Sequence, residues 1–276
     1  MKYPGHIIHE GEQDKGIVVA IQERLIAVGC GVTDVNQDGK FEKLQADGEF
    51  GPQTTEAVAT FQAKFDDLQG RRLIVDGEVG SNTWGALFGT ESVPTIEKAD
   101  SELLGRVLEK ARSQIGQSEK PPGSNGGGMV KEYLAAVGLD EGFPWCAAFI
   151  YWCFREVEKP TTTRCIKTAG VLDHWARAGS QGIRRIGFQQ ARENPGLIKP
   201  GMIFIMDTGP AGGAGHTGIV EKIEGGALVT VEGNTNAAGS REGTAAARQD
   251  LPSSQRGFHQ QRLHRLRCLT LCAQPA

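Results

Sequence analysis

One cysteine stands where the sequence predicts the first turn of a helix. Residues 142–152 read GFPWCAAFIYW, in which Gly142 and Pro144 interrupt the chain just before Cys146, and apolar residues then recur at helical spacing. A helix start offers unpaired N–H groups and the positive end of the helix dipole, which stabilise a thiolate, the nucleophilic form of cysteine. The alternative is a thiol that only packs, and this alternative suits Cys153, two turns further along.

A nucleophilic cysteine needs a base, and the base needs a group that orients it. His216 begins the stretch HTGIVEKIEGGALVTVEGNTN, which predicts a β-hairpin with its turn at residues 225–226. A turn centred there places His216 opposite Thr235, and a register one residue tighter places it opposite Asn234. Either Glu232 or Asn234 can orient the imidazole in such a hairpin, and the sequence does not fix the register.

The other histidines are weaker candidates for the base. His6 and His9 fall in an N-terminal stretch that we expect to fray, and His174 falls on a predicted helix as a surface or half-buried residue. His259 and His264 lie in a charged C-terminal stretch.

Composition excludes several classes of protein. The chain has 276 residues, 39% of them hydrophobic, and a net charge of −3, which suits one large or two ordinary soluble domains. The charge gives no basic field, and the longest apolar run, at 146–154, is too short to span a membrane. We therefore expect no nucleic-acid partner and no membrane insertion. The N-terminus lacks the hydrophobic region of a signal peptide, so we expect synthesis in the cytoplasm without one.

Six cysteines in 276 residues are too few to indicate a disulfide framework. No CxxC spacing occurs, so the sequence does not indicate a zinc site. We interpret Cys268 and Cys272, four residues apart, as packing thiols, with a disulfide between them as the alternative.

The first half of the chain contains an internal repeat. DGEFGPQTTEAV begins at Asp47 and DGEVGSNTWGAL begins at Asp76. Each copy has an Asp-Gly turn and a second glycine before a predicted helix, for which Pro52 suits the first position and Ser81 the N-cap. With one amphipathic helix before the first copy, the pattern predicts a small three-helix unit with two similar turns.

Between the first two predicted helices, the sequence DVNQDGKFEKLQAD is similar to the first half of a calcium loop. Asp34, Asn36 and Asp38 place oxygen ligands at alternate positions, and a glycine follows at the bend. Gln45 stands where such a loop needs a bidentate Glu. We expect a polar turn without metal, with weak calcium binding as the alternative, and no required cofactor.

These motifs resemble two known families. VVAIQERL, DGEFGPQTTEAVATFQ and VDGEVGSNTWGAL resemble the peptidoglycan-binding domain type 1 family. FPWCAAFIYW, KPGMIFI, GHTGIVEKIEGG and VEGNTN resemble, in this order, the cysteine, histidine-dependent amidohydrolase/peptidase (CHAP) family. The resemblance implies an α+β protein with a three-helix peptidoglycan-binding domain at 14–90, a linker at 91–102, and a papain-like α+β domain with an antiparallel sheet at 103–270.

The CHAP resemblance implies hydrolysis of an amide bond in peptidoglycan, the partner of the binding domain. Cys146 is then the nucleophile, with its own N–H in the oxyanion hole, and His216 is the general base. Glu232 is the favoured orienting group, and Asn234 is a second polar contact near the site.

Asn125 and Trp145 are the expected substrate-binding residues, with a loop cap and packing beside the thiol as their respective alternatives. A wall hydrolase without a signal peptide suits a phage endolysin released through membrane holes. It equally suits a secreted antibacterial toxin, which would have an immunity protein as a partner. The competing hypotheses are a catalytically inactive wall-binding protein and a cysteine protease acting on protein substrates. The sequence does not tell which peptidoglycan amide is cut.

Overall fold

The computed structural model describes residues 1–159, 163–207, 215–224, 227–235, 243–251 and 266–270. Its N-terminal part is helical, with three α-helices, a short hairpin and a 3-10 turn: α1 (Lys15–Ala27), β1 (Val32–Thr33), β2 (Glu42–Lys43), α2 (Pro52–Lys64), α3 (Ser81–Phe88) and η1 (Thr90–Ser92). The described residues do not include the predicted hairpin turn at 225–226, nor His259, His264 and Cys272.

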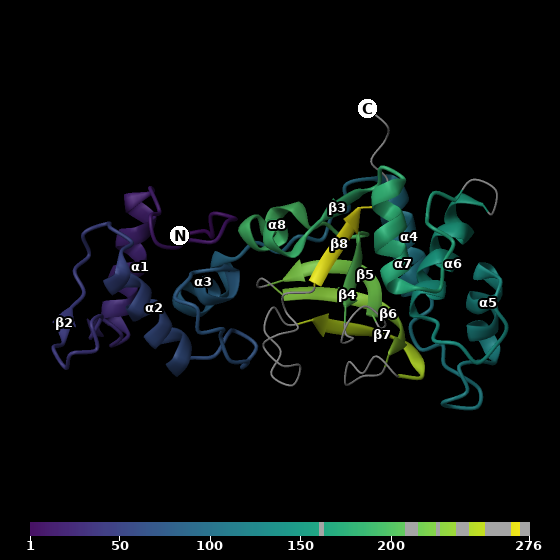
Figure 1. The fold of residues 1–276 in the computed structure, drawn as a ribbon, viewed down its shortest axis with the longest axis horizontal. Helices are drawn as coiled ribbons and strands as arrows, with labels where there is room; N and C mark the ends of the chain where they lie inside the picture. Colours follow the sequence, from purple (N-terminus) through teal and green to yellow (C-terminus); the bar gives the residue numbers. More distant parts are fainter. Residues whose placement is uncertain (160–162, 208–214, 225–226, 236–242, 252–265, 271–276) are drawn as a thin grey trace.

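The second part combines helices with strands (Figure 1). Its helices are α4 (Glu102–Arg112), α5 (Gly128–Val137), α6 (Cys146–Glu158), α7 (Val171–Ser180), α8 (Phe188–Glu193) and the 3-10 turn η2 (Pro195–Leu197). Its strands are β3 (Arg184–Ile186), β4 (Ile203–Asp207), β5 (Gly215–Glu224), β6 (Ala227–Thr235), β7 (Ala245–Leu251) and β8 (Leu266–Thr270).

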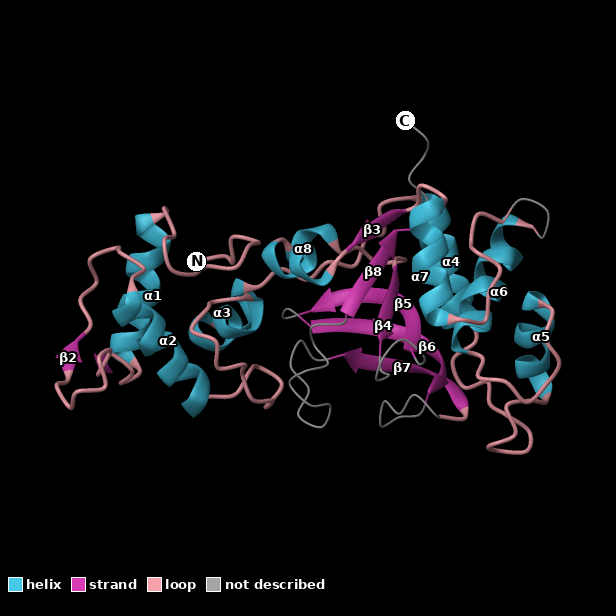
Figure 2. Ribbon diagram, in the orientation of Figure 1, coloured by secondary structure: helices cyan, strands magenta, loops and turns pink. Residues whose placement is uncertain are grey.

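The strands form one antiparallel sheet of six described strands in the order β3-β8-β4-β5-β6-β7. Helices α4 and α6 pack against β5 and β6, the two strands of the predicted hairpin. Figure 2 shows the helical N-terminal part beside this sheet-containing part. The α+β class predicted from the sequence is therefore confirmed, with a helical N-terminal unit and an antiparallel sheet in the second domain.

A buried glutamine holds the first copy of the repeat. Gln22 of α1 is 1% exposed. Its side-chain amide donates to Asp47 Oδ1 at 2.9 Å and to Thr54 Oγ1 at 3.0 Å, and its oxygen accepts from the N–H of Gly48 at 2.9 Å. One side chain from the preceding helix thus satisfies both the Asp-Gly turn and the first turn of α2.

The second copy repeats these contacts with different residues. Gln62 of α2 donates to Asp76 Oδ1 at 2.9 Å and to Thr83 Oγ1 at 3.2 Å, and accepts from the N–H of Gly77 at 2.9 Å. The internal repeat in the sequence is therefore a repeated hydrogen-bond network, in which a helix holds the turn that starts the next helix.

The N-terminal stretch does not fray, contrary to expectation. Ile8 is fully buried and forms two backbone hydrogen bonds with Val79, at 3.1 and 2.8 Å. The N–H of Tyr3 donates to the carbonyl of Ser92 at 2.7 Å, and the Tyr3 ring lies 5.9 Å from that of Trp84. Isolated apolar residues without a periodic pattern gave no signal in the sequence, yet they complete the core around α3.

Residues after η1 also contact the second domain. Ile96 and Ile223 of β5 exchange two backbone hydrogen bonds of 2.9 Å, where β5 extends past its neighbour β4. The Ile96 side chain packs against the cluster that contains Ile223. This part of the expected linker is therefore held against the end of the sheet.

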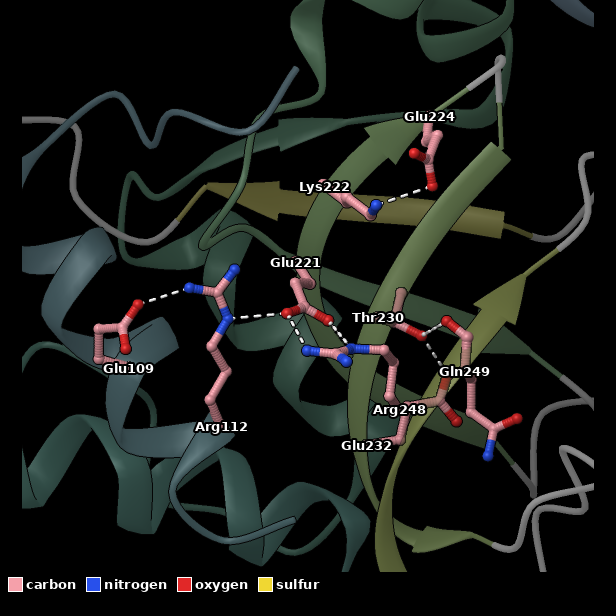
Figure 3. Close-up of polar contacts among 9 residues, drawn as sticks. All are labelled: Glu109, Arg112, Glu221, Lys222, Glu224, Thr230, Glu232, Arg248 and Gln249. Carbon is pink, nitrogen blue, oxygen red and sulfur yellow. Dashed lines mark hydrogen bonds and ion pairs between the residues drawn. The ribbon is translucent and has the colours of Figure 1, made fainter. Parts of the chain in front are cut away.

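A buried carboxylate ties α4 to the sheet (Figure 3). Glu221 lies at a bulge of β5 and is 3% exposed. Arg112 of α4 donates to it at 2.8 Å, and Arg248 of β7 donates to both its oxygens at 2.5 and 2.7 Å. Burial raises the pKa of Glu221, but the two guanidinium groups outweigh this effect and lower the pKa below its ordinary value.

We expect Glu221→Gln to lower the free energy of unfolding by about 1–3 kcal/mol near neutral pH, because it removes charge-assisted hydrogen bonds. A carboxyl whose pKa is lowered on folding stabilises the fold above its unfolded pKa, and this stabilisation is lost as the pH falls through the folded pKa. The difference between variant and wild type in urea unfolding should therefore shrink from about pH 7 to about pH 3. A difference that stays constant over this range would contradict the role given to the ion pairs.

Candidate active site

Cys146 is the first residue of α6, as the sequence predicts, and Trp145 is the N-cap. The thiol residue is buried, with 4% of its surface exposed. The first hydrogen bond of the helix runs from Phe149 to the Trp145 carbonyl, so the N–H of Cys146 has no partner within the helix. This position gives Cys146 both the positive end of the helix dipole and a backbone donor beside its sulfur.

The histidine of the predicted hairpin contacts a carboxylate on the neighbouring strand. His216 of β5 is 3% exposed, and its Nε2 lies 2.7 Å from Oε2 of Glu232 on β6, which is 1% exposed. The other oxygen of Glu232 accepts a hydrogen bond of 2.6 Å from the Thr230 hydroxyl. Both oxygens of this buried carboxylate are thus satisfied by neighbouring side chains.

The bulge of β5 decides which register the hairpin has at His216. Near the turn, Ile223 pairs with Leu228, which is the register of a turn centred at 225–226. Past the bulge, Gly218 pairs with Glu232, one residue tighter. His216 shares a face with Gly218, because the two are two residues apart on one strand. Glu232 is therefore the diagonal neighbour of His216, within hydrogen-bonding reach.

Two glycines inside strands allow the close approaches at the site. A Cβ at Gly218 would lie 2.6 Å from Cε1 of Phe204 and 2.7 Å from Cγ of Glu232. A Cβ at Gly233 would lie 2.7 Å from Cζ3 of Trp145, the residue before Cys146. Gly218 therefore leaves room for Glu232 to reach His216, and Gly233 lets the start of α6 pack directly on β6.

The imidazole has Cys146 as its second neighbour. Burial alone lowers the pKa of His216, but its interactions with the neighbouring Cys146 and with the carboxylate of Glu232 outweigh burial and raise the pKa to about 10. Glu232 occupies Nε2, and Nδ1 has no hydrogen bond of ordinary geometry to any described residue. Nδ1 is therefore the nitrogen left for the thiol. A protonated imidazole in this place stabilises a thiolate.

The remaining predicted catalytic residue is also buried near this end of β6. Asn234 is 4% exposed and adopts a left-handed backbone conformation, with φ 56°. Of the two candidate orienting groups, Glu232 is the one whose side chain contacts the imidazole of His216.

The two predicted substrate-binding residues have different environments. Asn125 is half-buried, and its carbonyl accepts a 2.9 Å hydrogen bond from Gly142, so its loop lies against the segment that leads into Cys146. Trp145 is fully buried, and its ring stacks on Tyr133 with centroids 5.5 Å apart. The structure thus places the Trp145 indole in the core, directly before Cys146 in the chain.

Sequence reasoning missed one buried carboxylate at this site. Glu119 is 3% exposed and accepts a 2.9 Å hydrogen bond from Nε1 of Trp145. Its backbone N–H donates to the carbonyl of Thr244 at 2.9 Å, so it is anchored beside the start of β7. Its sequence context, QSEKPPG, is typical of an exposed polar loop and gave no signal of burial.

His174 differs from its predicted environment. It is 1% exposed, and burial lowers its pKa to about 4, so it packs as a neutral residue of α7. His6, by contrast, is part-exposed and pairs with Glu12 at 3.0 Å.

The calcium-like segment forms a polar turn between β1 and β2. The carboxylate of Asp34 accepts hydrogen bonds from the N–H groups of Asp38 and Gly39, at 3.1 and 3.0 Å. Asp38 pairs with Lys40 at 3.1 Å, and Asn36 is exposed. Within the described ranges, no group of three or more His, Cys, Asp or Glu side chains is arranged to hold a metal ion.

Comparison with known families gives two matches. Residues 138–234 match the family model described as CHAP domain, and residues 15–87 match the model described as putative peptidoglycan binding domain. The first range contains Cys146, His216 and Glu232, and the second contains both glutamine networks. No curated protein and no solved structure matches the chain. Among the described helices, none has the length and apolarity to cross a membrane.

Both resemblances inferred from the sequence are therefore confirmed. A CHAP domain combined with a peptidoglycan-binding domain supports a peptidoglycan hydrolase that acts at the cell wall.

We expect Gly218→Ala to separate Glu232 from His216, because the new Cβ would lie within 2.7 Å of Glu232 Cγ. The pKa of His216, measured by NMR titration, should fall from about 10 toward its ordinary value. The free energy of unfolding should fall by about 1–3 kcal/mol.

Gly105→Ala provides the matched control, since nothing lies within 4 Å of a Cβ built at this position of α4. It should leave the His216 titration unchanged and stabilise the helix slightly. A Gly218→Ala variant that keeps the pKa of His216 near the wild-type value would refute the steric argument.

Proposed function

Because the chain joins a CHAP domain to a peptidoglycan-binding domain, we propose that it hydrolyses an amide bond of peptidoglycan with Cys146 as nucleophile and His216 as general base. One observation carries this proposal. The first residue of α6 is a cysteine beside a buried imidazole whose other nitrogen is fixed, at 2.7 Å, by a buried carboxylate. This arrangement supports the proposed roles of Cys146 as nucleophile, His216 as base and Glu232 as orienting group.

The acylation step follows from this arrangement. Nδ1 of His216 accepts the thiol proton, and the sulfur of Cys146 attacks the carbonyl carbon of the amide. The resulting oxyanion is stabilised by the N–H of Cys146 at the start of α6. When the tetrahedral intermediate collapses, the C–N bond breaks, His216 returns its proton to the leaving amine, and a thioester remains on Cys146.

Water completes the reaction. His216 removes a proton from water, and the hydroxide attacks the thioester carbonyl. The C–S bond breaks, the proton returns to the sulfur, and a carboxylic acid leaves. These steps draw on no metal ion, so a chelator should leave the wild-type rate unchanged.

The neighbouring residues position this pair. Glu232 accepts a hydrogen bond from the Nε2–H of His216, which keeps Nδ1 directed at the thiol, and Asn234 serves as a second polar contact nearby. Trp145, buried and bound to Glu119, fixes the start of α6. Asn125 is the residue we assign to substrate, because its loop borders the segment before Cys146.

The N-terminal domain holds the enzyme on its polymeric substrate. A bound wall raises the local concentration of amide bonds, so that weak affinity at the catalytic site suffices. This combination fits a phage endolysin and also a secreted antibacterial effector, which would require an immunity protein in the producing cell.

We expect Cys146→Ala and His216→Ala to fold, to sediment with purified walls, and to cause no loss of wall turbidity, whereas the wild type clears the suspension. Cys153→Ala is the matched control, because Cys153 is a fully buried thiol of the same helix without a role in the proposed steps. It should retain hydrolysis.

Lysis by Cys146→Ala would rule out the thiol mechanism. A wild-type protein that binds walls without cleaving them would indicate an adhesion protein, and cleavage of casein instead of walls would indicate a protease. Mass spectrometry of the released fragments identifies which amide is cut.

Glu232→Gln removes the charge that helps to raise the pKa of His216. The imidazolium form then persists only to a lower pH, so the basic limb of kcat/KM should move from near pH 10 toward neutrality. Initial rates between about pH 6 and about pH 10.5 measure this shift. Glu224→Gln, at an exposed end of the same hairpin, should leave the limb in place. An unchanged basic limb in Glu232→Gln would show that another group orients His216.

A further inference from the structure

The side chain of Thr230 is fully buried and contacts Oε1 of Glu232, the carboxylate oxygen that His216 does not contact (Figure 3). The Thr230 hydroxyl lies 2.6 Å from Oε1 of Glu232 and 3.4 Å from the carbonyl of Gln249. A hydroxyl has one proton to donate, and the shorter contact is with the stronger acceptor. Because an ionised carboxylate only accepts, Thr230 is the donor to Glu232.

This contact extends the site to four groups in a row. Thr230 and Glu232 are two residues apart on β6 and share a face of the sheet. Thr230 donates to one oxygen of Glu232, and His216 contacts the other, with Cys146 beyond the imidazole. Thr230 itself is remote from the reacting atoms and acts only through Glu232.

Because Glu232 is buried, the hydrogen bond from Thr230 affects the stability of its ionised form. Glu232 is 1% exposed, and an ionised carboxylate in such a place depends on its donors, since water does not reach it. Without the hydroxyl, Oε1 loses its side-chain donor, and the ionised form becomes less favourable. A protonated Glu232 no longer stabilises an imidazolium at His216, so the thiolate of Cys146 loses its counterion.

We propose that Thr230 is a positioning residue that keeps Glu232 ionised and directed at His216, and so sets the lowest pH at which the Cys146 thiolate is available. This inference rests on the proposed thiol mechanism and names a further residue for it.

Few other titratable or charged groups of the described residues face the carboxylate of Glu232. From β5, the titratable group that faces Glu232 is His216, with Cys146 of α6 behind it. From β7, the residue opposite Glu232 is Ala247, so the next residue, Arg248, lies on the other face with Glu221. From β4, Phe204 approaches the same face beside Gly218.

The test uses Thr230→Val, which keeps the shape and removes the hydroxyl, and Thr230→Ser, which restores it. The main readout is the rate at which iodoacetamide alkylates Cys146, followed by mass spectrometry of its peptide between about pH 4 and about pH 8. This assay needs no wall substrate. The acidic limb of the profile should move up by about one pH unit in Thr230→Val, a tenfold loss of rate on that limb. Thr230→Ser should return the limb to its wild-type position.

Thr217→Val is the matched control. Thr217 is also fully buried, follows His216 in the chain, and donates an equally short hydrogen bond of 2.6 Å, but to the carbonyl of Phe204. Its loss should lower stability without moving the acidic limb. If Thr230→Val does not fold, by circular dichroism, Thr230→Ala takes its place.

An acidic limb that stays in place in Thr230→Val, or that moves equally in Thr217→Val, overturns the inference. Wall lysis is measured in parallel on the wild type. A wild type that does not lyse walls while Thr230→Val shifts the alkylation profile refutes the proposed function and leaves the inference standing for the thiol pair.

Discussion

The contact between the carboxylate of Glu232 and the imidazole of His216, buried and 2.7 Å long, is the interaction on which the site depends. A carboxylate removed from water is unfavourable unless charge or hydrogen bonds compensate it. An imidazole in the same place favours its neutral form unless an anion lies beside it. Each group therefore makes the charged form of the other tenable, and Cys146 lies where the resulting imidazolium can hold a thiolate. Gly218 is what allows this diagonal contact between two strands.

Much of this arrangement could be predicted from local sequence, and the rest depends on tertiary contacts. Cys146 at a helix start and His216 on a hairpin strand follow from turn residues and apolar periodicity. The choice of Glu232 did not follow, because it depends on the extra residue that the bulge inserts in β5. The sequence around Glu221 does not predict this bulge, because a single acidic residue among apolar strand residues does not indicate an inserted residue.

The same limit applies to residues that act through long-range hydrogen bonds. The repeat in the N-terminal domain was visible as spacing, but the role of Gln22 and Gln62 emerges only when each helix meets the turn it holds. Glu119 and the N-terminal Ile8 gave no periodic signal, and both are buried by partners distant in sequence. Periodicity reports which face of an element is apolar, and it carries no information about which polar side chain will be enclosed.

The hairpin of β5 and β6 carries two buried carboxylates, Glu221 and Glu232, whose hydrogen-bond partners differ in kind. Glu221 meets two arginines, whose charges persist at every physiological pH, so its ion pairs are a fixed link between α4 and the sheet. Glu232 meets a hydroxyl and an imidazole, so the cation beside it exists only while His216 holds a proton. The ion pairs of Glu221 therefore keep their cations at neutral pH, whereas the charge beside Glu232 changes with the protonation of His216. The two carboxylates are linked through the bulge. Glu221, which binds the arginines, is also the extra residue that shifts the register and brings Glu232 within reach of His216.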